Sequence, residues 1–229
     1  MNQASPNPGV ALVGSDRRLL ISEIYASIQG ESSHAGRPCT FVRLTGCPLR
    51  CRWCDTEYAF TGGEQMGLDQ VMAEVSRLGL GLVQVTGGEP LAQRPVGALV
   101  AALCEAGHEV LIETSGTLPV DRLDPRARII ADLKCPGSGE AWRTRWPILA
   151  RLRAIDELKI VVADRADFDW AVAALGAALA QMAATVLWSP VADALAPARL
   201  AGWLMDSGVR GRLQIQLHKV LWPDTDRGV

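Results

Sequence analysis

The chain has 229 residues, 48% of them hydrophobic, and its 23 Lys and Arg against 25 Asp and Glu give a formal net charge of −2. This length and apolar content suffice to bury one sizeable core, and the near-neutral charge argues against a nucleic-acid-binding protein, which needs clustered positive charge. The apolar runs are shorter than the ~20 residues that span a bilayer, and the amino terminus does not resemble a secretory signal, so we expect a cytoplasmic protein without a membrane partner. The first 18 residues, rich in Pro, Asn and Gly, are expected to form a disordered lead-in. Residues 19–229 are expected to form a single domain.

Short β-rich runs then alternate with Ala- and Leu-rich stretches of helical period. We predict strands at residues 20–28, 40–44, 82–86, 110–113, 129–133, 157–162, 186–189 and 213–217. We predict helices at residues 68–78, 96–106, 146–154, 167–182 and 197–207. This alternation indicates an α/β fold built from βαβ units with a mostly parallel sheet. About six units fit, which leaves an open six-unit barrel or a doubly wound sheet, and both place the chemistry at the carboxyl ends of the strands.

Three cysteines, Cys47, Cys51 and Cys54, follow the second predicted strand in the spacing C-x₃-C-x₂-C. Without an export signal the six cysteines are expected to be reduced thiols, and thiolates are the preferred ligands of iron–sulfur clusters. Three ligands would leave one iron of a cubane cluster open for a substrate. Two alternatives remain: Cys39 or Cys135 could close a zinc site or an electron-transfer cluster, or the cysteines could be small buried residues.

Polar motifs also end later strands. In the segment 86–90, Thr-Gly-Gly-Glu-Pro, the glycines would let a ligand approach the backbone, and Glu89 could accept hydrogen bonds from an ammonium group. Asp132 and Lys134 flank Leu133 and should point to one face of an extended strand. The alternatives are a turn before a helix and a surface ion pair. Residues 113–117 and 189–191 close two further strands with polar groups.

Three further features favour a polar, anionic substrate. Gln29 and Glu31 together offer donors and acceptors that suit the edge of a flat heterocycle. Arg43 lies between apolar residues and needs an anionic partner, either a substrate carboxylate or a structural ion pair. Thr56 follows the cysteines, and its hydroxyl could join an oxygen-rich magnesium site or simply cap the next turn.

The cysteine motif, with Trp53 before the third cysteine, resembles the radical S-adenosylmethionine (SAM) enzymes. The resemblance implies a partial (βα)₆ barrel, a [4Fe–4S] cluster whose open iron binds SAM, and reductive cleavage of SAM to a deoxyadenosyl radical. On this resemblance SAM contacts a set of motif residues: Trp53, Asp55, Gly88, Glu89, Ser115, Asp132, Leu133, Lys134, Ser189, Pro190 and Val191.

The segment 27–32, together with Arg43, Thr56 and the terminal residues 216–219, resembles the 7-carboxy-7-deazaguanine synthases. Those lyases contract the ring of 6-carboxy-5,6,7,8-tetrahydropterin with loss of ammonia, in the biosynthesis of queuosine and related deazapurines. The resemblance implies Mg²⁺ with Thr56 as its protein ligand, a homodimer, and an external one-electron reductant such as flavodoxin. It assigns the pterin to Ile28, Gln29, Gly30, Glu31, Arg43, Thr86 and His218.

The chain departs from that family at its end. Family members end in a substrate-contacting carboxyl terminus, whereas this chain continues past Lys219 to Val229, so that contact is not transferred. An enzyme that installs a glycyl radical in a partner protein is an alternative with the same cluster motif. An iron–sulfur redox sensor is the alternative outside enzymology.

Overall fold

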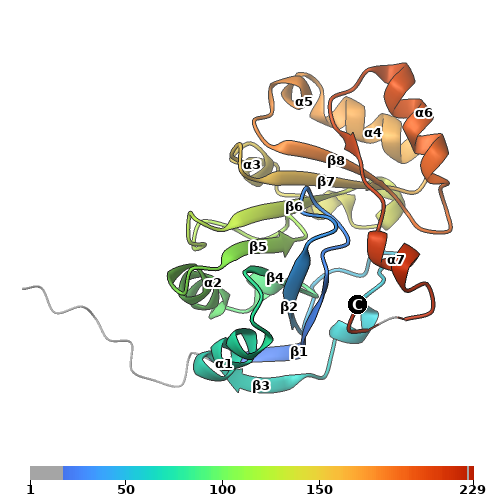
Figure 1. The fold of residues 1–229 in the computed structure, drawn as a ribbon. Coiled ribbons are helices and arrows are strands. Elements are labelled where there is room, and N and C mark those ends of the chain that lie inside the picture. Colours follow the sequence, from blue (N-terminus) through green and yellow to red (C-terminus); the bar gives the residue numbers. More distant parts are fainter. Residues whose placement is uncertain (1–17, 226) are drawn as a thin grey trace, which may run out of the picture.

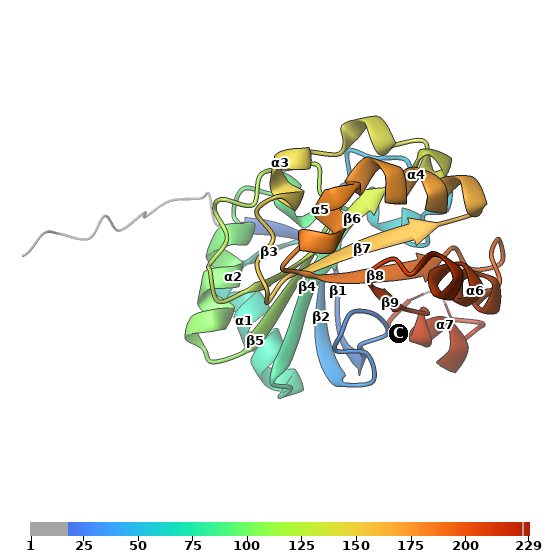
Figure 2. The same ribbon diagram turned by 90° about the horizontal axis from the view of Figure 1, so that it is seen from above.

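The computed structural model describes residues 18–225 and 227–229, and its framework is an open sheet of nine strands. The order across the sheet is β3-β1-β2-β4-β5-β6-β7-β8-β9. The strands are β1 (Arg18–Ile28), β2 (Pro38–Leu44), β3 (Glu64–Gly67), β4 (Leu82–Gly87), β5 (Glu109–Thr114), β6 (Arg128–Lys134), β7 (Glu157–Val162), β8 (Thr185–Pro190) and β9 (Arg212–Leu213). From β2 to β9 all neighbours are parallel, whereas β1 is antiparallel to β2 and β3. Since its two edges do not pair, the sheet forms the expected partial barrel (Figure 2).

Helices cover the outer face of this sheet (Figure 1). They are α1 (Leu68–Leu78), α2 (Val96–Glu105), α3 (Trp146–Leu149), α4 (Arg165–Leu175), α5 (Ala177–Gln181) and α6 (Pro197–Ser207), whereas α7 (Leu217–Leu221) lies at the open side of the barrel near the carboxyl terminus. In α1 the residues Val71 and Val75 lie one turn apart and are fully buried against the sheet. The helix ends at Gly79, whose φ of 71° is the left-handed conformation that favours glycine. The main core therefore lies between the helices and the outer face of the sheet.

Two predicted helices are shorter than expected. The predicted helix 167–182 breaks into α4 and α5 at Gly176, whose φ is 48°. The predicted helix 146–154 stops at Leu149, and downstream the Arg153 N–H donates to the side chain of Asp156 (2.8 Å) instead of a helical carbonyl. A glycine conformation at residue 176 and a hydrogen bond to the Asp156 side chain thus end the two helices, although the spacing of apolar residues favoured longer ones.

The inner face of the barrel changes from apolar to polar along its strands. An apolar cluster closes the barrel near the amino ends of the parallel strands and contains Cys39, Phe41, Leu82, Leu111 and Ile130. Side chains alternate along a strand, so the next inward positions are two residues further on. Those positions are Gln84, Glu113 and Asp132, and all are polar. An apolar layer therefore closes the bottom of a polar cavity.

The carboxyl-terminal segment leaves the sheet early. The predicted strand 213–217 is wrong: β9 ends at Leu213, and Leu217 begins α7. Gln214 Oε1 accepts the N–H of Ser32 (2.7 Å), and the Leu217 N–H donates to the carbonyl of Gly30 (2.9 Å). The segment thus joins the turn between β1 and β2 and walls the open side of the barrel.

The expected lead-in, residues 1–18, lies outside the described residues apart from Arg18, the first residue of β1. Within the described ranges no helix is long and apolar enough to cross a membrane.

Candidate active site

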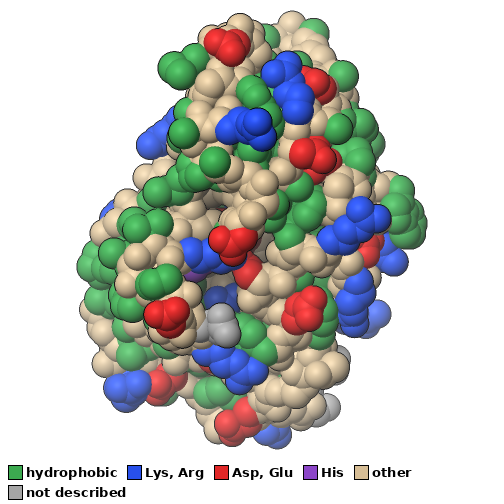
Figure 3. All heavy atoms as spheres, turned by 90° about the vertical axis from the view of Figure 1, so that its right-hand side faces the viewer, with side chains coloured by type: hydrophobic (Ala, Val, Ile, Leu, Met, Phe, Trp, Pro, Cys, Tyr) green, Lys and Arg blue, Asp and Glu red, His purple; other side chains and the backbone are tan. Residues whose placement is uncertain are grey.

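A cavity of about 670 Å³ opens among the carboxyl ends of the strands. The space-filling view onto the side where α7 lies shows that face hollowed near its centre, with charged side chains around the hollow (Figure 3). Most sequence-predicted site residues line this cavity: Ile28, Gln29, Gly30, Glu31, Arg43, Cys47, Cys51, Trp53, Cys54, Asp55, Thr56, Thr86, Gly88, Ser115, Asp132, Lys134, Val191 and His218.

The cysteine loop starts directly after β2 and is fixed from both sides. The Gly88 N–H donates to the carbonyl of Leu44 (3.0 Å), and the Glu89 N–H donates to that of Gly46 (2.7 Å). On the other side the Arg52 N–H donates to the carbonyl of Ser138 (3.1 Å). A Cβ on Gly88 would overlap the Gly46 carbonyl oxygen. The glycine therefore serves close packing of two protein loops, in addition to the expected approach of a ligand.

The three motif thiols are half-buried and face the same cavity. Burial raises the pKa of the thiols of Cys47, Cys51 and Cys54, so a bound metal must supply the charge that keeps them as thiolates. Within the described ranges no three His, Cys, Asp or Glu side chains are grouped for a single metal ion. Three thiols spread around one cavity instead fit a larger cluster with an open position.

Neither proposed fourth thiol reaches this cavity. Cys39 and Cys135 are fully buried in apolar clusters, and burial raises the pKa of Cys39 to about 12 and that of Cys135 far above its usual range. The cavity lining contains neither of them. A closed site with four cysteines is therefore not formed.

Glu89, a predicted SAM contact, is buried behind the cavity lining. Its carboxylate is fully buried and accepts hydrogen bonds from the N–H of Leu91 (2.9 Å) and of Ser115 (2.7 Å), and from the hydroxyls of Thr114 and Ser115. It does not line the cavity. In this structure the carboxylate ties the loop after β4 to the end of β5, and its contact with the ammonium group of SAM stays a prediction.

Asp132 and Lys134 share one face of β6, as expected, and form an ion pair of 2.8 Å. Asp132 Oδ1 is buried and has no hydrogen-bond partner among the described residues, so it is free to accept a bond from a ligand. Three other predicted SAM contacts do not line the cavity with their side chains: Leu133, Ser189 and Pro190. The side chain of Leu133 lies in the outer core because alternation turns it away from its neighbours.

A wall of the cavity next to Asp132 carries a chain of amides and carboxylates. Gln29 Nε2 donates to Gln84 Oε1, and Gln84 Nε2 donates to Glu113 Oε2 (2.9 Å). Lys159 Nζ bridges Glu113 and Glu31, and lies 2.8 Å from Glu31 Oε2. Glu113, from the polar segment 113–117 that closes β5, thus lies with Glu31.

Arg43 forms the structural ion pair that the sequence left open. Its Nε lies 2.7 Å from Glu23 Oε1, and its Nη2 donates to the hydroxyl of Tyr25 (2.8 Å). The Tyr58 hydroxyl donates to the same Glu23 oxygen (2.8 Å). Arg43 still lines the cavity, and its Nη1 has no hydrogen-bond partner among the described residues. Glu23 thus balances the Arg43 charge and leaves one edge of the guanidinium open.

The cavity rim near Thr56 is acidic. The Thr56 hydroxyl donates to Asp55 Oδ1 (2.9 Å), and Gln216 Nε2 donates to Asp55 Oδ2 (3.1 Å). Burial alone would raise the pKa of Asp55, but Lys219 and these hydrogen bonds outweigh it and lower the pKa to about 2. The Thr56 oxygen keeps lone pairs for a cation, so it fits the expected magnesium ligand as a single protein donor.

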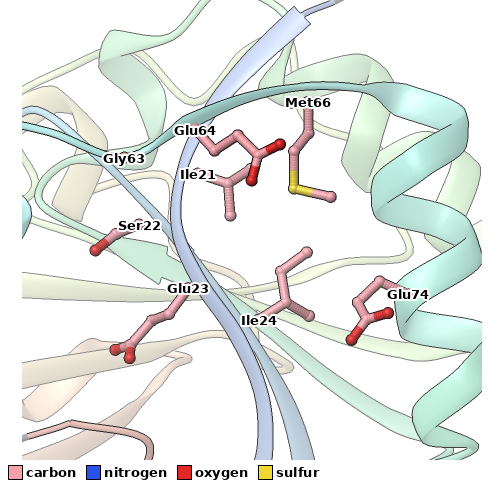
Figure 4. A pocket seen from close by; sticks show the side chains of 8 residues that line it. All are labelled: Ile21, Ser22, Glu23, Ile24, Gly63, Glu64, Met66 and Glu74. Atoms are coloured by element: carbon pink, nitrogen blue, oxygen red, sulfur yellow. The ribbon is translucent and has the colours of Figure 1, made fainter.

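A second pocket of about 440 Å³ lies between β1, β3 and α1 (Figure 4). Its lining includes the carboxylates of Glu23, Glu64 and Glu74 and none of the predicted site residues. The chemistry therefore concentrates in the larger cavity.

Comparison with known proteins agrees with this geometry. Residues 41–136 match the radical SAM superfamily. A 7-carboxy-7-deazaguanine synthase of Chlorobaculum tepidum is 44% identical over 92% of this chain and 97% of its own. That of Koribacter versatilis is 42% identical over 91% and 99%. The chain belongs to the 7-carboxy-7-deazaguanine synthase family.

A solved member of this synthase family supports the assignment of the fold. The structure of QueE from Escherichia coli matches with a TM-score of 0.72 and 27% identity, and covers 88% of this chain and 95% of that one. SuiB of Streptococcus suis, bound to the precursor peptide SuiA, matches with a TM-score of 0.56 at 11% identity, which shows a shared fold alone.

Membership of the synthase family confirms the predicted cofactors, which are a [4Fe–4S] cluster, SAM and Mg²⁺. It confirms a radical SAM lyase that needs a small-molecule substrate and an external reductant. The glycyl-radical-activating enzyme and the redox sensor are therefore not retained.

Several cavity residues of this synthase family member were missed from sequence: Tyr25, Tyr58, Gln84, Lys159, Trp222 and Val229. A signal existed for Lys159, since a cation between the apolar residues Leu158 and Ile160 of a strand demands a buried partner. For Val229 the signal was the substrate-contacting carboxyl terminus of the resembled family, which was not transferred to this chain; Val229 lines the cavity, and its backbone oxygen accepts the Tyr25 hydroxyl (3.2 Å).

Proposed function

We propose that this protein converts 6-carboxy-5,6,7,8-tetrahydropterin into 7-carboxy-7-deazaguanine and ammonia. The observation that carries the proposal is one cavity that joins the cysteine motif to the wall of Gln29, Glu31 and Glu113. The product has the atoms of the substrate less one ammonia, so no net oxidant is needed and SAM is used catalytically.

Cys47, Cys51 and Cys54 would hold the cluster, and Asp132, Lys134 and Ser115 would contact SAM beside it. When bound, the cluster and SAM supply a hydrogen-abstracting radical. The apolar floor and the surrounding strands exclude water from the cavity and so protect such a species. Lys134 is held by Asp132 (2.8 Å), and this fixes its charge on the cluster side.

Gln29, Glu31 and Glu113 would recognise the pterin by its polar edge. Carboxylates accept the N–H groups of an aminopyrimidinone ring, and an amide can both donate and accept. In the same cavity Arg43 would offer its Nη1, which has no hydrogen-bond partner among the described residues, to the substrate carboxylate, and Thr56 would hold the Mg²⁺. His218 lies against Gly30, where any Cβ would overlap its ring, so it would border the same edge of the substrate.

The direct test is an anaerobic reaction of the reconstituted protein with the pterin, SAM, dithionite and Mg²⁺. We expect 7-carboxy-7-deazaguanine and one equivalent of ammonia for each pterin consumed. Cleavage of SAM to deoxyadenosine without any deazapurine would overturn the proposal.

The ligand set can be tested separately. We expect Cys51→Ala to abolish the visible absorption of the reconstituted cluster, whereas Cys39→Ala and Cys135→Ala keep the wild-type iron content. Loss of the cluster in Cys135→Ala would contradict the assignment of three ligands.

We further infer a cytoplasmic homodimer that takes electrons from a flavodoxin-like protein. The six thiols need a reducing compartment to stay free. Light scattering coupled to size-exclusion chromatography tests the dimer, and a mass of one chain would refute it. Turnover with reduced flavodoxin in place of dithionite tests the electron donor.

A further inference from the structure

Lys159 is a buried cation in the middle of β7. Its neighbours Leu158 and Ile160 are fully buried in the outer core, and alternation turns Lys159 inward to the cavity. Only 9% of its side chain is exposed. A buried ammonium is unfavourable unless its protons meet acceptors, so its partners explain why it is tolerated.

Three carboxylates from three separate elements surround Lys159 Nζ. Glu31 Oε2, from the turn after β1, lies at 2.8 Å, and Glu113 Oε1, from β5, is in direct contact. Asp132 Oδ2, from β6, lies at 3.8 Å. Two of the three ammonium protons are thus donated to Glu31 and Glu113, and Asp132 adds a third negative charge within ion-pair distance.

Lys159 lies between two carboxylates, Glu31 and Glu113, on the same wall of the cavity. Without it, Glu31 and Glu113 would repel each other, and one would be held protonated. A protonated carboxyl group presents an O–H donor to a ring edge that itself offers N–H donors. The two ionised glutamates therefore require the cation between them.

We propose that Lys159 is a positioning residue that keeps Glu31 and Glu113 ionised and oriented toward the N–H groups of the bound pterin. This inference rests on the proposed function. Lys159 acts through the two glutamates and does not itself contact the substrate.

The charges around Lys159 agree with this role. Burial would lower the pKa of Lys159, but Glu113 and Glu31 outweigh it and raise the pKa well above the usual value. Burial would also raise the pKa of Glu31, yet Lys159 outweighs it and lowers that pKa. Burial keeps the pKa of Glu113 raised even beside Lys159, so this carboxyl group depends most on the cation. The other charged or titratable groups near Lys159, Glu31 and Glu113 are Asp55, Asp132, Lys134 and His218.

The test measures binding of 6-carboxy-5,6,7,8-tetrahydropterin by anaerobic calorimetry, with the protein carrying its cluster and SAM, between pH 6 and pH 9. The ratio of variant to wild-type Kd cancels the titration of the ligand itself. For Lys159→Met we expect the ratio to rise about tenfold for each pH unit below the new carboxyl pKa and to approach one at high pH. Lys159→Arg retains the charge and is expected to show a flatter profile.

In the double variant Lys159→Met/Glu113→Gln the cation and one of the two carboxylates are both absent, so no repelling carboxylate pair is left. This variant also provides a measurement if Lys159→Met alone does not fold. We expect its Kd ratio to be independent of pH. Arg77→Met, which removes a cation from the exposed ion pair with Glu74, is the control and should bind as the wild type does.

A pH-independent Kd ratio for Lys159→Met, or a steep one for the double variant, would overturn the proposal. Absence of pterin binding by the wild type would instead refute the proposed function. The two failures are therefore distinguishable.

Discussion

Replacing Glu89 with Ala separates two roles for this carboxylate, that of a SAM ligand and that of a structural tie. In the structure it accepts the buried N–H groups of Leu91 and Ser115 as well as two hydroxyls. The two hydroxyls can rotate to other partners; for example, the Ser115 hydroxyl already lies 2.8 Å from the hydroxyl of Thr117. The backbone N–H groups cannot rotate in this way. The stability cost should therefore come mainly from two orphaned backbone donors.

Each buried unsatisfied donor costs ~1–3 kcal/mol, so with the lost side-chain packing we expect the free energy of unfolding to fall by about 3–5 kcal/mol. At ~2–4 °C per kcal/mol for a chain of this size, the melting temperature should fall by about 10 °C. Differential scanning calorimetry of the reconstituted protein measures this, and Glu64→Ala, an exposed glutamate of β3, is the control.

An unchanged melting temperature in Glu89→Ala together with lost SAM binding would refute this reasoning. In that case the carboxylate would contact SAM directly.

Three further predictions follow from single positions. Gly88→Ala should lower the cluster content and SAM affinity, measured by iron assay and calorimetry, because the new Cβ would overlap the Gly46 carbonyl beside Cys47; wild-type values would contradict the packing role. Thr56→Ala should shift the Mg²⁺ dependence of product formation to at least about tenfold higher concentration, the equivalent of ~1.4 kcal/mol, while an unchanged Mg²⁺ titration would show that Thr56 is no ligand. For Asp156, burial would raise the carboxyl pKa, but hydrogen bonds from Arg153 and from the Ile129 N–H outweigh it and lower the pKa. Its contribution to stability is thus complete above about pH 4 and is lost as the pH falls through the lowered pKa. Asp156→Asn should therefore weaken the acid dependence of urea unfolding between pH 5 and pH 3, and an unaltered slope would disprove the linkage.

The parallel core was largely predictable because its patterns are local. The runs that became β4, β5, β6 and β8 and the helix Pro197–Ser207 combine apolar residues with glycine or proline near their ends, and the run of β7 is recognisable from its apolar residues alone. The cysteine spacing was equally informative, since three thiols within eight residues have few structural uses.

The parts that were not predictable depend on partners distant in the sequence. β3 consists of exposed and half-buried residues, Glu64–Gly67, and forms only because β1 offers it a paired edge. The orientation of Glu89 depends on Ser115 and Thr114, which follow it by 25 or more residues. The pairing of Arg43 with Glu23 arises from the antiparallel register of β1 and β2. No periodicity carries such information.

The junction between the turn after β1 and the carboxyl-terminal segment affects the order in which the site is assembled. Glu31 and Gln216, which meet across the cavity (2.9 Å), are 185 residues apart. At a synthesis rate of ~5–20 residues per second, the first of them waits about 10–40 s for the second. During that time the cysteine loop and most parallel strands have already left the ribosome. The contact between Glu31 and Gln216 is therefore among the last parts of the cavity that can form, and the loop of Cys47, Cys51 and Cys54 is synthesised well before this side of the cavity is complete.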